Sequence, residues 1–239
     1  MTLACENSRL ARVLEPEAMD TLADARDYDT MDHADVNRRF VDDFLAASAA
    51  AGVEPNAEVL DLGTGTAQIP IELCRRIPAA RVVAIDLARH MLAVASDNVR
   101  HAGLTDRIRL ELVDAKTLPY ADGRFRAIMS NSIAHHIPQP RSALAEAVRV
   151  VAPGALLFVR DLARPLDDAE VSRLVAAYAG NCHAHQRQLF EDSLRAALSV
   201  GELRSLVVEL GFEPSTVSAT SDRHWTWSAV SGSKQGDPR

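Results

Sequence analysis

The sequence predicts an α/β fold in which a doubly wound, mostly parallel sheet carries helices on both faces. Short apolar runs alternate with amphipathic stretches of helical length over residues 58–162. The runs are rich in Val, Ile and Leu at consecutive positions, as expected where helices bury both faces of a strand. Repeated strand–helix units favour a parallel sheet whose ligand site lies outside the carboxyl ends of the strands.

The chain starts with a polar segment, residues 1–33, which we interpret as an amphipathic lead-in rather than a separate domain. Residues 35–51 form the first expected helix, because apolar residues recur there at helical spacing and mark one buried face. Gly52 and Pro55 end this helix, because glycine readily takes the left-handed conformation that follows a helix and proline has no N–H to donate. We therefore expect the sheet to begin only after this point.

From residue 56 the expected strands and helices alternate. Each strand is short and apolar, and each helix has one apolar stripe, so helical crossovers join consecutive strands. Gly103 supplies a stop for the second of these helices. The expected strands are 58–63, 81–87, 108–113, 125–132 and 155–162, and the expected helices are 67–77, 88–103 and 140–154.

The pattern changes after Pro165. Residues 167–198 are expected to be helical, 201–210 to form another helix, and 215–220 and 224–230 to form two closing strands. We expect all of these parts to belong to a single domain. They are a helical lead-in or lid (1–55), a ligand-binding core (56–162), a helical lid or substrate segment (163–200), a closing helix and strands (201–231) and a mobile tail (232–239).

The composition and charge of the 239 residues exclude several classes of protein. Apolar residues make up 47% and charged residues 25%, which is ordinary for a soluble protein whose core needs no covalent cross-links. The formal net charge of −7 and the pI near 5.6 disfavour a general nucleic-acid binder, because such a protein needs clustered Lys and Arg. We therefore expect no nucleic-acid partner.

The cysteines and the N-terminus bear on the compartment. Cys5, Cys74 and Cys182 are odd in number, far apart and in no CxxC pair, so neither a disulfide framework nor a thiolate zinc site is expected. The first residues carry charges where a signal peptide needs an apolar run, and no stretch approaches the roughly 20 apolar residues of a membrane helix. These features predict a cytoplasmic protein with no membrane partner, and they do not indicate an oligomeric state.

A glycine-containing turn follows the first expected strand. The stretch DLGTGTA, residues 61–67, lies between that strand and the next helix, where glycines let the backbone approach a ligand closely. One GxG is a weak signal, and Gln68 stands where a dinucleotide fingerprint has its third glycine. A plain strand-to-helix turn is the alternative interpretation.

Acidic residues end the next two strands. Asp86 ends the second strand, where a carboxylate can accept hydrogen bonds from both hydroxyls of a ribose. Asp114 follows the third strand. Each has an alternative interpretation as a helix cap, because Asp is a favoured capping residue. Three strand ends that each present Asp or Gly to one rim favour a ligand site over capping alone.

Together, the segments DLGTGTAQIP, VVAIDLARHML, LVDAKTLPYADGRFRAIMSNSIAHHI and VAPGALLFVRD resemble the successive motifs of class I S-adenosylmethionine-dependent methyltransferases. The likeness is strongest to the small-molecule branch that includes ubiquinone/menaquinone-type enzymes, and it covers roughly residues 56–162. It implies a Rossmann-like seven-stranded sheet with a reversed last strand, which fits the closing pair of strands. It also implies S-adenosyl-L-methionine as the cofactor and a small-molecule methyl acceptor as the partner.

The resemblance further implies roles for nine residues around the cofactor. The glycine turn would hold the methionine portion, the strand-end carboxylates would bind the ribose and the adenine, and a tyrosine of the lead-in would fold over the cofactor. Gly63 and Gly65, with Asp61 nearby, would hold the methionine portion, and Asn131 would lie near the sulfonium. Asp86 would bind the ribose, and Leu87, Asp114 and Ala115 would surround the adenine. Tyr28 would fold over the cofactor. No pyrophosphate has to be cradled in such a site, so Gln68 is tolerable and a dehydrogenase is the weaker interpretation.

On the acceptor side, the ends of the fourth and fifth strands supply the candidate catalytic residues. Of His135 and His136, the second is preferred because family members often carry histidine there, and it would act if the acceptor must lose a proton. Arg160 would bind an acidic group of the acceptor through its planar fork. The alternatives are a structural histidine, and a salt bridge of Arg160 to Asp161 or to a neighbouring loop.

Five other histidine and tryptophan positions have two interpretations each. His183, His185 and His224 could form a metal site with His136, yet scattered histidines are more often surface residues, so no metal is expected. The tryptophans alternate along the last strand and fit either the core or an acceptor pocket. These are Trp225 and Trp227.

The predicted function is therefore transfer of a methyl group from S-adenosylmethionine to a small molecule by in-line displacement. The alternatives are a cofactor-binding protein without catalysis, such as a sensor or an assembly partner, and a methyltransferase that acts on RNA or protein. The full motif set favours the enzyme, and the acidic balance favours the small acceptor. The lead-in around Tyr28 and residues 165–198 are expected to form a lid over the strand ends.

Overall fold

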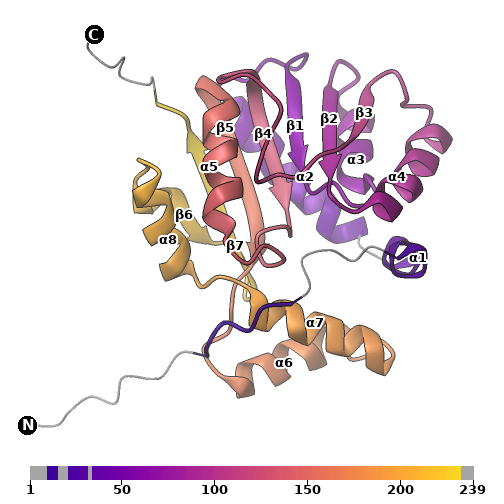
Figure 1. Ribbon diagram of the computed structural model, residues 1–239, viewed down its shortest axis with the longest axis vertical. Coiled ribbons are helices and arrows are strands. Elements are labelled where there is room, and N and C mark those ends of the chain that lie inside the picture. The colour runs from indigo at the N-terminus through magenta and orange to yellow at the C-terminus, as the bar shows by residue number, and fades with distance from the viewer. Residues whose placement is uncertain (1–9, 16–20, 32–33, 233–239) are drawn as a thin grey trace, which may run out of the picture.

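The computed structural model describes residues 10–15, 21–31 and 34–232 (Figure 1). Seven strands of the described chain form a sheet in the order β3-β2-β1-β4-β5-β7-β6. They are β1 (Glu58–Leu62), β2 (Arg81–Asp86), β3 (Ile108–Leu112), β4 (Phe125–Asn131), β5 (Val151–Leu162), β6 (Val217–Ala219) and β7 (His224–Val230). Cys5 and the predicted tail from residue 233 onward lie outside the described residues.

The sheet is parallel from β3 to β5 and reverses direction at β7. β7 pairs antiparallel with both β5 and β6, so it lies inside the sheet and the short β6 forms the edge. The chain starts at β1 in the middle, winds outward to β3 and then crosses back to β4. This confirms the predicted doubly wound sheet of seven strands with a reversed last strand.

Helices bury both faces of the sheet. Apolar side chains of α2, α3 and α4 pack on one face, and those of α5 and α8 pack on the other. The eight α-helices of the described residues are α1 (Leu22–Thr30), α2 (Ala34–Ala50), α3 (Gln68–Arg76), α4 (Arg89–His101), α5 (Pro140–Val150), α6 (Asp168–Ala179), α7 (Ala184–Ala196) and α8 (Val200–Glu209). Within the ranges described, no helix is both long and apolar enough to cross a membrane.

The predicted helix over 140–154 is wrong in its last four residues. α5 ends at Val150, and Val151 already pairs with Phe125 as the first residue of β5. The register of this pairing shifts before Ala127, and Gly154 adopts a φ of +73° within the irregular stretch. β-branched residues favour a strand, and glycine tolerates the irregular backbone, so β5 begins earlier than helical periodicity indicated.

The segment predicted as helical over 167–198 contains two helices rather than one. A turn separates α6 from α7, and the side chains of Asp167 and His183 cap their first turns by accepting backbone N–H groups. The predicted strand over 215–220 is shortened to β6, because Pro214–Thr216 form a 3-10 turn. The lead-in, for which no separate helix was predicted, contains α1.

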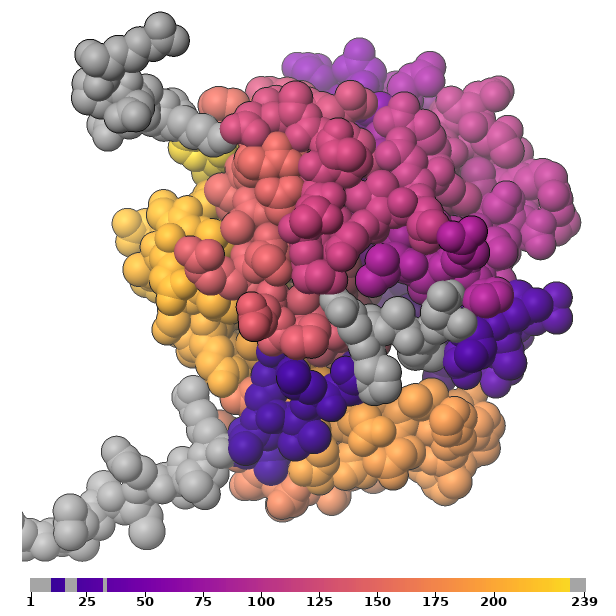
Figure 2. Space-filling model, in the orientation of Figure 1, coloured from indigo at the N-terminus to yellow at the C-terminus, as the bar shows by residue number. Residues whose placement is uncertain are grey.

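Residues 10–15, here called the N-terminal strap, lie against α7 (Figures 1 and 2). The backbone N–H of Leu10 donates to the carbonyl of Leu166 at 3.1 Å, and that of Val13 donates to the carbonyl of Arg195 at 3.1 Å. Apolar residues of α6 and α7 pack against Leu162, the last residue of β5. The strap and these two helices therefore lie beyond the carboxyl end of β5.

Candidate active site

The glycine turn after β1 has an unusual backbone. Gly63, Gly65 and Ala67 adopt φ values of +71°, +55° and +62°, and Ala67 immediately precedes α3. A left-handed conformation is uncommon for a non-glycine residue and is held by its surroundings. One such constraint is the N–H of Thr64, which donates to the carbonyl of Ile85 in β2 at 2.8 Å. The turn is thus fixed to the neighbouring strand.

The segment after β4 packs directly on this turn. A Cβ atom on Gly63 would lie 2.8 Å from Cδ1 of Ile133, which is closer than carbon atoms approach in proteins. Ser132, between Asn131 and Ile133, is the second described non-glycine residue with a positive φ, at +60°. Two strained residues in two adjacent turns identify this edge of the sheet as a candidate site.

Asp86 connects the first two turns. Its Oδ2 accepts the N–H of Gly65 at 2.8 Å, and its Oδ1 accepts the N–H of Ala88, just before α4, at 2.8 Å. Burial raises the pKa of Asp86, although the backbone N–H groups oppose the rise. The carboxylate therefore fixes the turn just before α4 without capping that helix, whose first turn has no side-chain cap among the described residues, and it also faces the glycine turn. Each carboxylate oxygen keeps a further lone pair for a ligand.

Asp61 is buried beneath the turn, with an exposed fraction of 3%. Burial raises its pKa to about 7, and the negative charge of Asp86 adds to the effect. Asp61 is therefore about half protonated near neutral pH. A ligand that brings a positive charge would stabilise its ionised form. The pKa of Asp61 is thus the strongest electrostatic signal at this edge.

Helix α1 brings Tyr28 to the glycine turn. Cε1 of Tyr28 would lie 3.8 Å from a Cβ on Gly65, and burial together with the charge of Asp86 raises the pKa of the phenol. The next residue, Asp29, accepts hydrogen bonds from Gln68 at 3.0 Å and from Asn98 at 2.8 Å. Gln68, in place of a third glycine, therefore anchors the lead-in over the turn.

The predicted adenine-side residues lie next to Asp86. The N–H of Val113 donates to the carbonyl of Asp86 at 3.1 Å, which brings the end of β3 to the end of β2. Asp114 accepts the N–H of Lys116 at 2.9 Å and also pairs with its Nζ at 3.0 Å. Leu87 is exposed and Ala115 is buried. The structure thus brings these predicted residues to one edge.

Some buried polar atoms at this edge have no hydrogen-bond partner within the described ranges. They include Oδ1 of Asn131, at the end of β4, and Oγ1 of Thr66, in the glycine turn. Buried polar groups are normally paired, so such atoms indicate groups that a polar ligand satisfies. S-Adenosylmethionine carries an ammonium, two ribose hydroxyls and an adenine amine as donors. The residues of this edge fit that cofactor.

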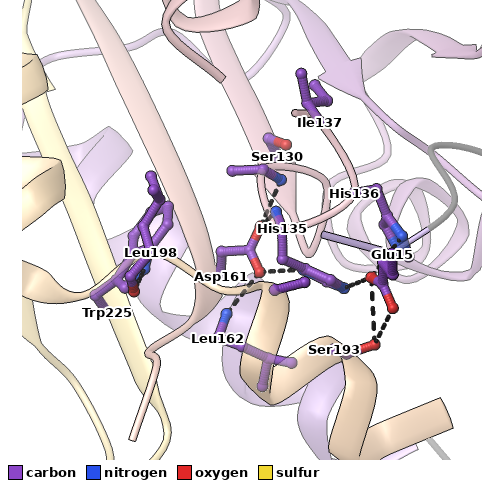
Figure 3. Close-up of polar contacts among 12 residues, drawn as sticks. Glu15, Ser130, His135, His136, Ile137, Asp161, Leu162, Ser193, Leu198 and Trp225 are labelled. Carbon is purple, nitrogen blue, oxygen red and sulfur yellow. Dashed lines mark hydrogen bonds and ion pairs between the residues drawn. The ribbon is translucent and has the colours of Figure 1, made fainter. Parts of the chain in front are cut away.

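A polar cluster lies at the ends of β4 and β5 (Figure 3). Nδ1 of the buried His135 donates to Oδ1 of Asp161 at 2.5 Å. Nδ1 of His136 lies 2.9 Å from Oε1 of Glu15 in the N-terminal strap, and Nε2 of His135 lies 3.5 Å from the same oxygen. The hydroxyl of Ser193 donates to Oε2 of Glu15 at 3.2 Å. Glu15 was missed in the sequence because nothing near it in the chain indicates this contact.

The ionisation of the cluster follows from its two carboxylates. Burial by itself lowers the pKa of His135, but the negative charges of Asp161 and Glu15 hold that pKa above its ordinary value. Burial in turn raises the pKa of Asp161, yet the imidazole of His135 and the backbone N–H groups keep it below its usual range. The three groups stabilise one another's charged forms.

Arg12 fixes the strap to the segment after β4. Its Nε donates to the carbonyl of Ala196 at 2.6 Å. Its two terminal nitrogens donate to four carbonyls of the segment after β4, at 3.0 to 3.3 Å, namely those of Ala134, His135, Ile137 and Pro138. A single guanidinium therefore holds the strap, the β4–α5 segment and the end of α7 together. No local sequence pattern indicates this role.

Arg160 differs from its predicted role. Its guanidinium is buried, donates to Asp43 of α2 at 2.6 Å and to Thr226 of β7 at 2.9 Å, and lies over the rings of Phe40 and Phe158. These contacts are those of a structural ion pair with α2. Asp161, the partner considered from the sequence, instead accepts from His135.

The remaining histidines and tryptophans do not join the cluster. His183 caps α7, and its ring stacks on His185 with the centroids 6.3 Å apart, whereas His224 lies beside Ser221. In the described part of the chain, the group that could hold a metal ion is instead Glu15, His135 and His136. Trp225 and Trp227 are fully buried, so both belong to the core rather than to an acceptor pocket.

Comparisons with known proteins agree with this geometry. The methyltransferase domain family matches residues 59–154. The malonyl-[acyl-carrier protein] O-methyltransferase of Geobacter sulfurreducens is 34% identical over 192 residues, which cover 77% of this chain and 68% of the relative. The demethylmenaquinone methyltransferase of Porphyromonas gingivalis is 35% identical over 117 residues, so the match spans about half of each protein, 48% in both cases.

A solved structure extends the likeness beyond the matched motifs. The S-adenosylmethionine-dependent methyltransferase of Aquifex aeolicus superposes with a TM-score of 0.64 over 88% of this chain and 98% of its own, at 18% identity. At this identity the likeness shows the fold alone. The shared fold includes the sheet whose strand ends carry the candidate site.

Proposed function

The chain belongs to the class I S-adenosylmethionine-dependent methyltransferases, and on this premise we propose that it methylates a small molecule bound at the ends of β4 and β5. The observation that carries the proposal is the edge formed by the glycine turn, Asp86 and Asn131. This edge lies next to a separate polar cluster around His136. The edge suits the cofactor, and the cluster around His136 suits an acceptor.

Each portion of the cofactor is proposed to contact its own set of residues. The turn at Gly63 and Gly65, with Asp61 beneath it, would hold the charged methionine portion, and Asn131 would lie near the sulfonium. Asp86 would accept the ribose hydroxyls. The adenine would lie beside Leu87 and Ala115 with its amine on Asp114, and Tyr28 would cover the cofactor from α1.

The chemistry requires little from the protein beyond placement. When bound, S-adenosylmethionine would supply an activated methyl group, whose carbon the acceptor attacks in line as S-adenosylhomocysteine leaves. The side chains around Asn131 would orient the cofactor, and those around His136 would orient the acceptor, which supplies much of the rate enhancement. The strap and the α6–α7 pair would exclude water from the closed site.

Ligand-dependent thermal stability tests the cofactor assignment. At one hundred times its dissociation constant, S-adenosylhomocysteine should stabilise the protein by about 2.7 kcal/mol, because it binds only the folded state. For a chain of this length, that corresponds to a midpoint raised by about 5–10 °C in differential scanning fluorimetry. NAD and NADP should leave the midpoint unchanged. Protection by NAD and none by S-adenosylhomocysteine would restore the dehydrogenase interpretation.

Turnover distinguishes the enzyme from a binding protein. Incubation of the protein with S-adenosylmethionine and a panel of small acceptors should release S-adenosylhomocysteine, measured by mass spectrometry. Thermal protection without turnover on any metabolite, RNA or protein acceptor would indicate a cofactor-binding protein. Turnover on RNA or protein alone would replace the small acceptor.

The pKa of Asp61 predicts a pH dependence of cofactor affinity. Because that pKa is about 7, Asp61 is ionised mainly above pH 7 and loses its charge as the pH falls. The cofactor's ammonium prefers the ionised form, so S-adenosylhomocysteine should bind about tenfold more weakly at pH 6 than at pH 8. Isothermal titration calorimetry measures this change.

The isosteric variant Asp61→Asn provides the control. It should bind S-adenosylhomocysteine more weakly than the wild type does at pH 8, and its affinity should be nearly constant between pH 6 and pH 8.

The stability of the apo-protein independently checks the direction of the pKa shift of Asp61. The folded-state pKa of Asp61 lies above the unfolded value, so ionising it opposes folding, and stability from this group falls between about pH 4 and pH 7. A wild-type affinity that does not change with pH would contradict the assignment.

A further inference from the structure

We propose that Glu15, His135 and His136 form a binding site for a divalent transition-metal ion of the zinc class. Oε1 of Glu15 lies 2.9 Å from Nδ1 of His136 and 3.5 Å from Nε2 of His135, and the three atoms all lie within 4.8 Å of one another (Figure 3). Two imidazoles and one carboxylate are ligands that zinc accepts in catalytic sites. Harder ions such as Mg²⁺ prefer oxygen ligands alone.

The spacing of the ligand atoms suits a tetrahedral ion. Ligands at about 2.0–2.1 Å from zinc stand roughly 3.3 Å apart when their angles are tetrahedral. The two measured distances, 2.9 and 3.5 Å, lie on either side of this value. Both distances from Glu15 are therefore compatible with ligands that share one tetrahedral ion.

Glu15 pairs with both histidines as an ion-pair contact, but, among the residues that the structure describes, Nδ1 of His136 forms no well-aligned hydrogen bond. Nδ1 of His136 is buried and, within the described residues, lacks a hydrogen-bond partner despite its closeness to Glu15. A buried ring nitrogen that does not form an aligned hydrogen bond needs another partner. A shared cation between the two imidazoles and the carboxylate supplies it.

A second layer of contacts orients the ligands. Nδ1 of His135 donates to Asp161, so a cation that displaces the second ring proton would meet the lone pair of Nε2 on the side of Glu15. Ser193 donates to the other oxygen of Glu15 at 3.2 Å. Arg12, three residues earlier in the strap, holds this part of the chain against the β4–α5 segment. Carboxylate–histidine pairs of this kind accompany metal sites in other proteins.

The site deepens the proposed function and rests on it. Three protein ligands leave the fourth position of a tetrahedral ion open, and an acceptor with a hydroxyl or carboxyl oxygen fits there. Binding to the ion would lower the pKa of that oxygen, and its proton would pass to solvent before the site closes. The oxygen lone pair then forms the bond to the methyl carbon as the carbon–sulfur bond breaks. The acceptor class is thus an ionisable oxygen nucleophile.

The proposed ligands differ from the metal site considered from the sequence, which joined His183, His185 and His224 to His136 and for which no metal was expected. The first three histidines lie elsewhere, and the sequence did not connect Glu15 with the histidine pair. His183 and His185 now serve as the matched control, because they are an exposed pair of histidines that could retain zinc without a built site.

The test measures zinc directly. The purified full chain is stripped with a chelator and given one equivalent of Zn²⁺, and the ion retained after gel filtration is quantified. We expect one ion per chain in the wild type and in His183→Gln/His185→Gln. The affinity should be at least tenfold weaker in Glu15→Gln and in His136→Gln. Co²⁺ in place of zinc should give the visible absorption of a tetrahedral site in the wild type and in His183→Gln/His185→Gln. Glu15→Gln and His136→Gln should not show this absorption. Mg²⁺ should not compete.

Binding of S-adenosylhomocysteine, measured on the same samples, separates the two proposals. Unchanged cofactor affinity in Glu15→Gln and His136→Gln would show that the variants fold and that only the ion is lost. Zinc retained equally by both variants, or lost with His183 and His185, would overturn the metal site and leave a proton-sharing cluster. Loss of cofactor binding in the wild type would instead overturn the proposed function.

Discussion

Valine in place of Gly63 is expected to abolish detectable binding of S-adenosylhomocysteine. Gly63 has a φ of +71°, and a non-glycine residue in this conformation costs about 1–2 kcal/mol. The added Cβ would also lie 2.8 Å from Ile133, so the segment after β4 has to move away from the turn. Both effects displace the backbone that is proposed to hold the methionine portion. Calorimetry measures the loss.

Gly52→Val separates backbone strain from loss of the site. Gly52 has a similar φ of +67°, but no atom lies within 4 Å of the position that its Cβ would take. This control should lose stability and keep the wild-type affinity for S-adenosylhomocysteine. Wild-type affinity in a folded Gly63→Val, verified by circular dichroism, would contradict the placement of the cofactor on this turn.

Alanine in place of Asp86 should weaken S-adenosylhomocysteine binding at least tenfold. The carboxylate is proposed to accept both ribose hydroxyls, and hydrogen bonds to a charged group contribute about 1.5–3 kcal/mol. The structure adds a second reason. Asp86 accepts the N–H groups of Gly65 and Ala88, so its removal also loosens the glycine turn. Calorimetry gives the affinity, and thermal unfolding gives the accompanying loss of stability.

Asp97→Ala provides the matched control on the same helix. Asp97 is exposed on α4 and pairs with Arg100 at 2.7 Å, which is a contact worth little in solvent. Its removal should leave both affinity and stability close to those of the wild type. Asp86→Ala with wild-type affinity would remove Asp86 from the ribose site, even if the melting temperature falls.

The sequence predicted the core of the fold because each of its elements has a local signature. The strands β1, β2, β4 and β5 are largely apolar on both faces, β3 alternates apolar and charged residues, and α3, α4 and α5 each have one apolar stripe. Periodicity therefore indicates where each element lies in the chain. The start of β5 was missed because Val151 follows a helix without a break, and only its pairing with Phe125 makes it a strand. α1 was missed because the lead-in is mostly polar.

The candidate site divides in the same way. Gly63, Asp86 and Asn131 were predicted because they end strands, and the ends of parallel strands meet at one edge. Glu15 and Arg160 could not be placed, since their partners are far away in the chain. Arg160 pairs with Asp43, 117 positions earlier. Contacts of this kind depend on the packing of helices on the sheet, which no local pattern encodes.

The contacts of Arg12 have a consequence for the order of events during synthesis. The carbonyls that it binds lie 122 to 184 residues later in the chain. At about 5–20 residues per second, translation leaves the strap without its last partner for roughly 10–40 seconds. During that interval the strap cannot form its long-range contacts. The βα units, which follow the strap in the chain, have time to assemble before the strap binds them. Glu15 likewise meets His135 and His136 only after about 120 further residues have been synthesised.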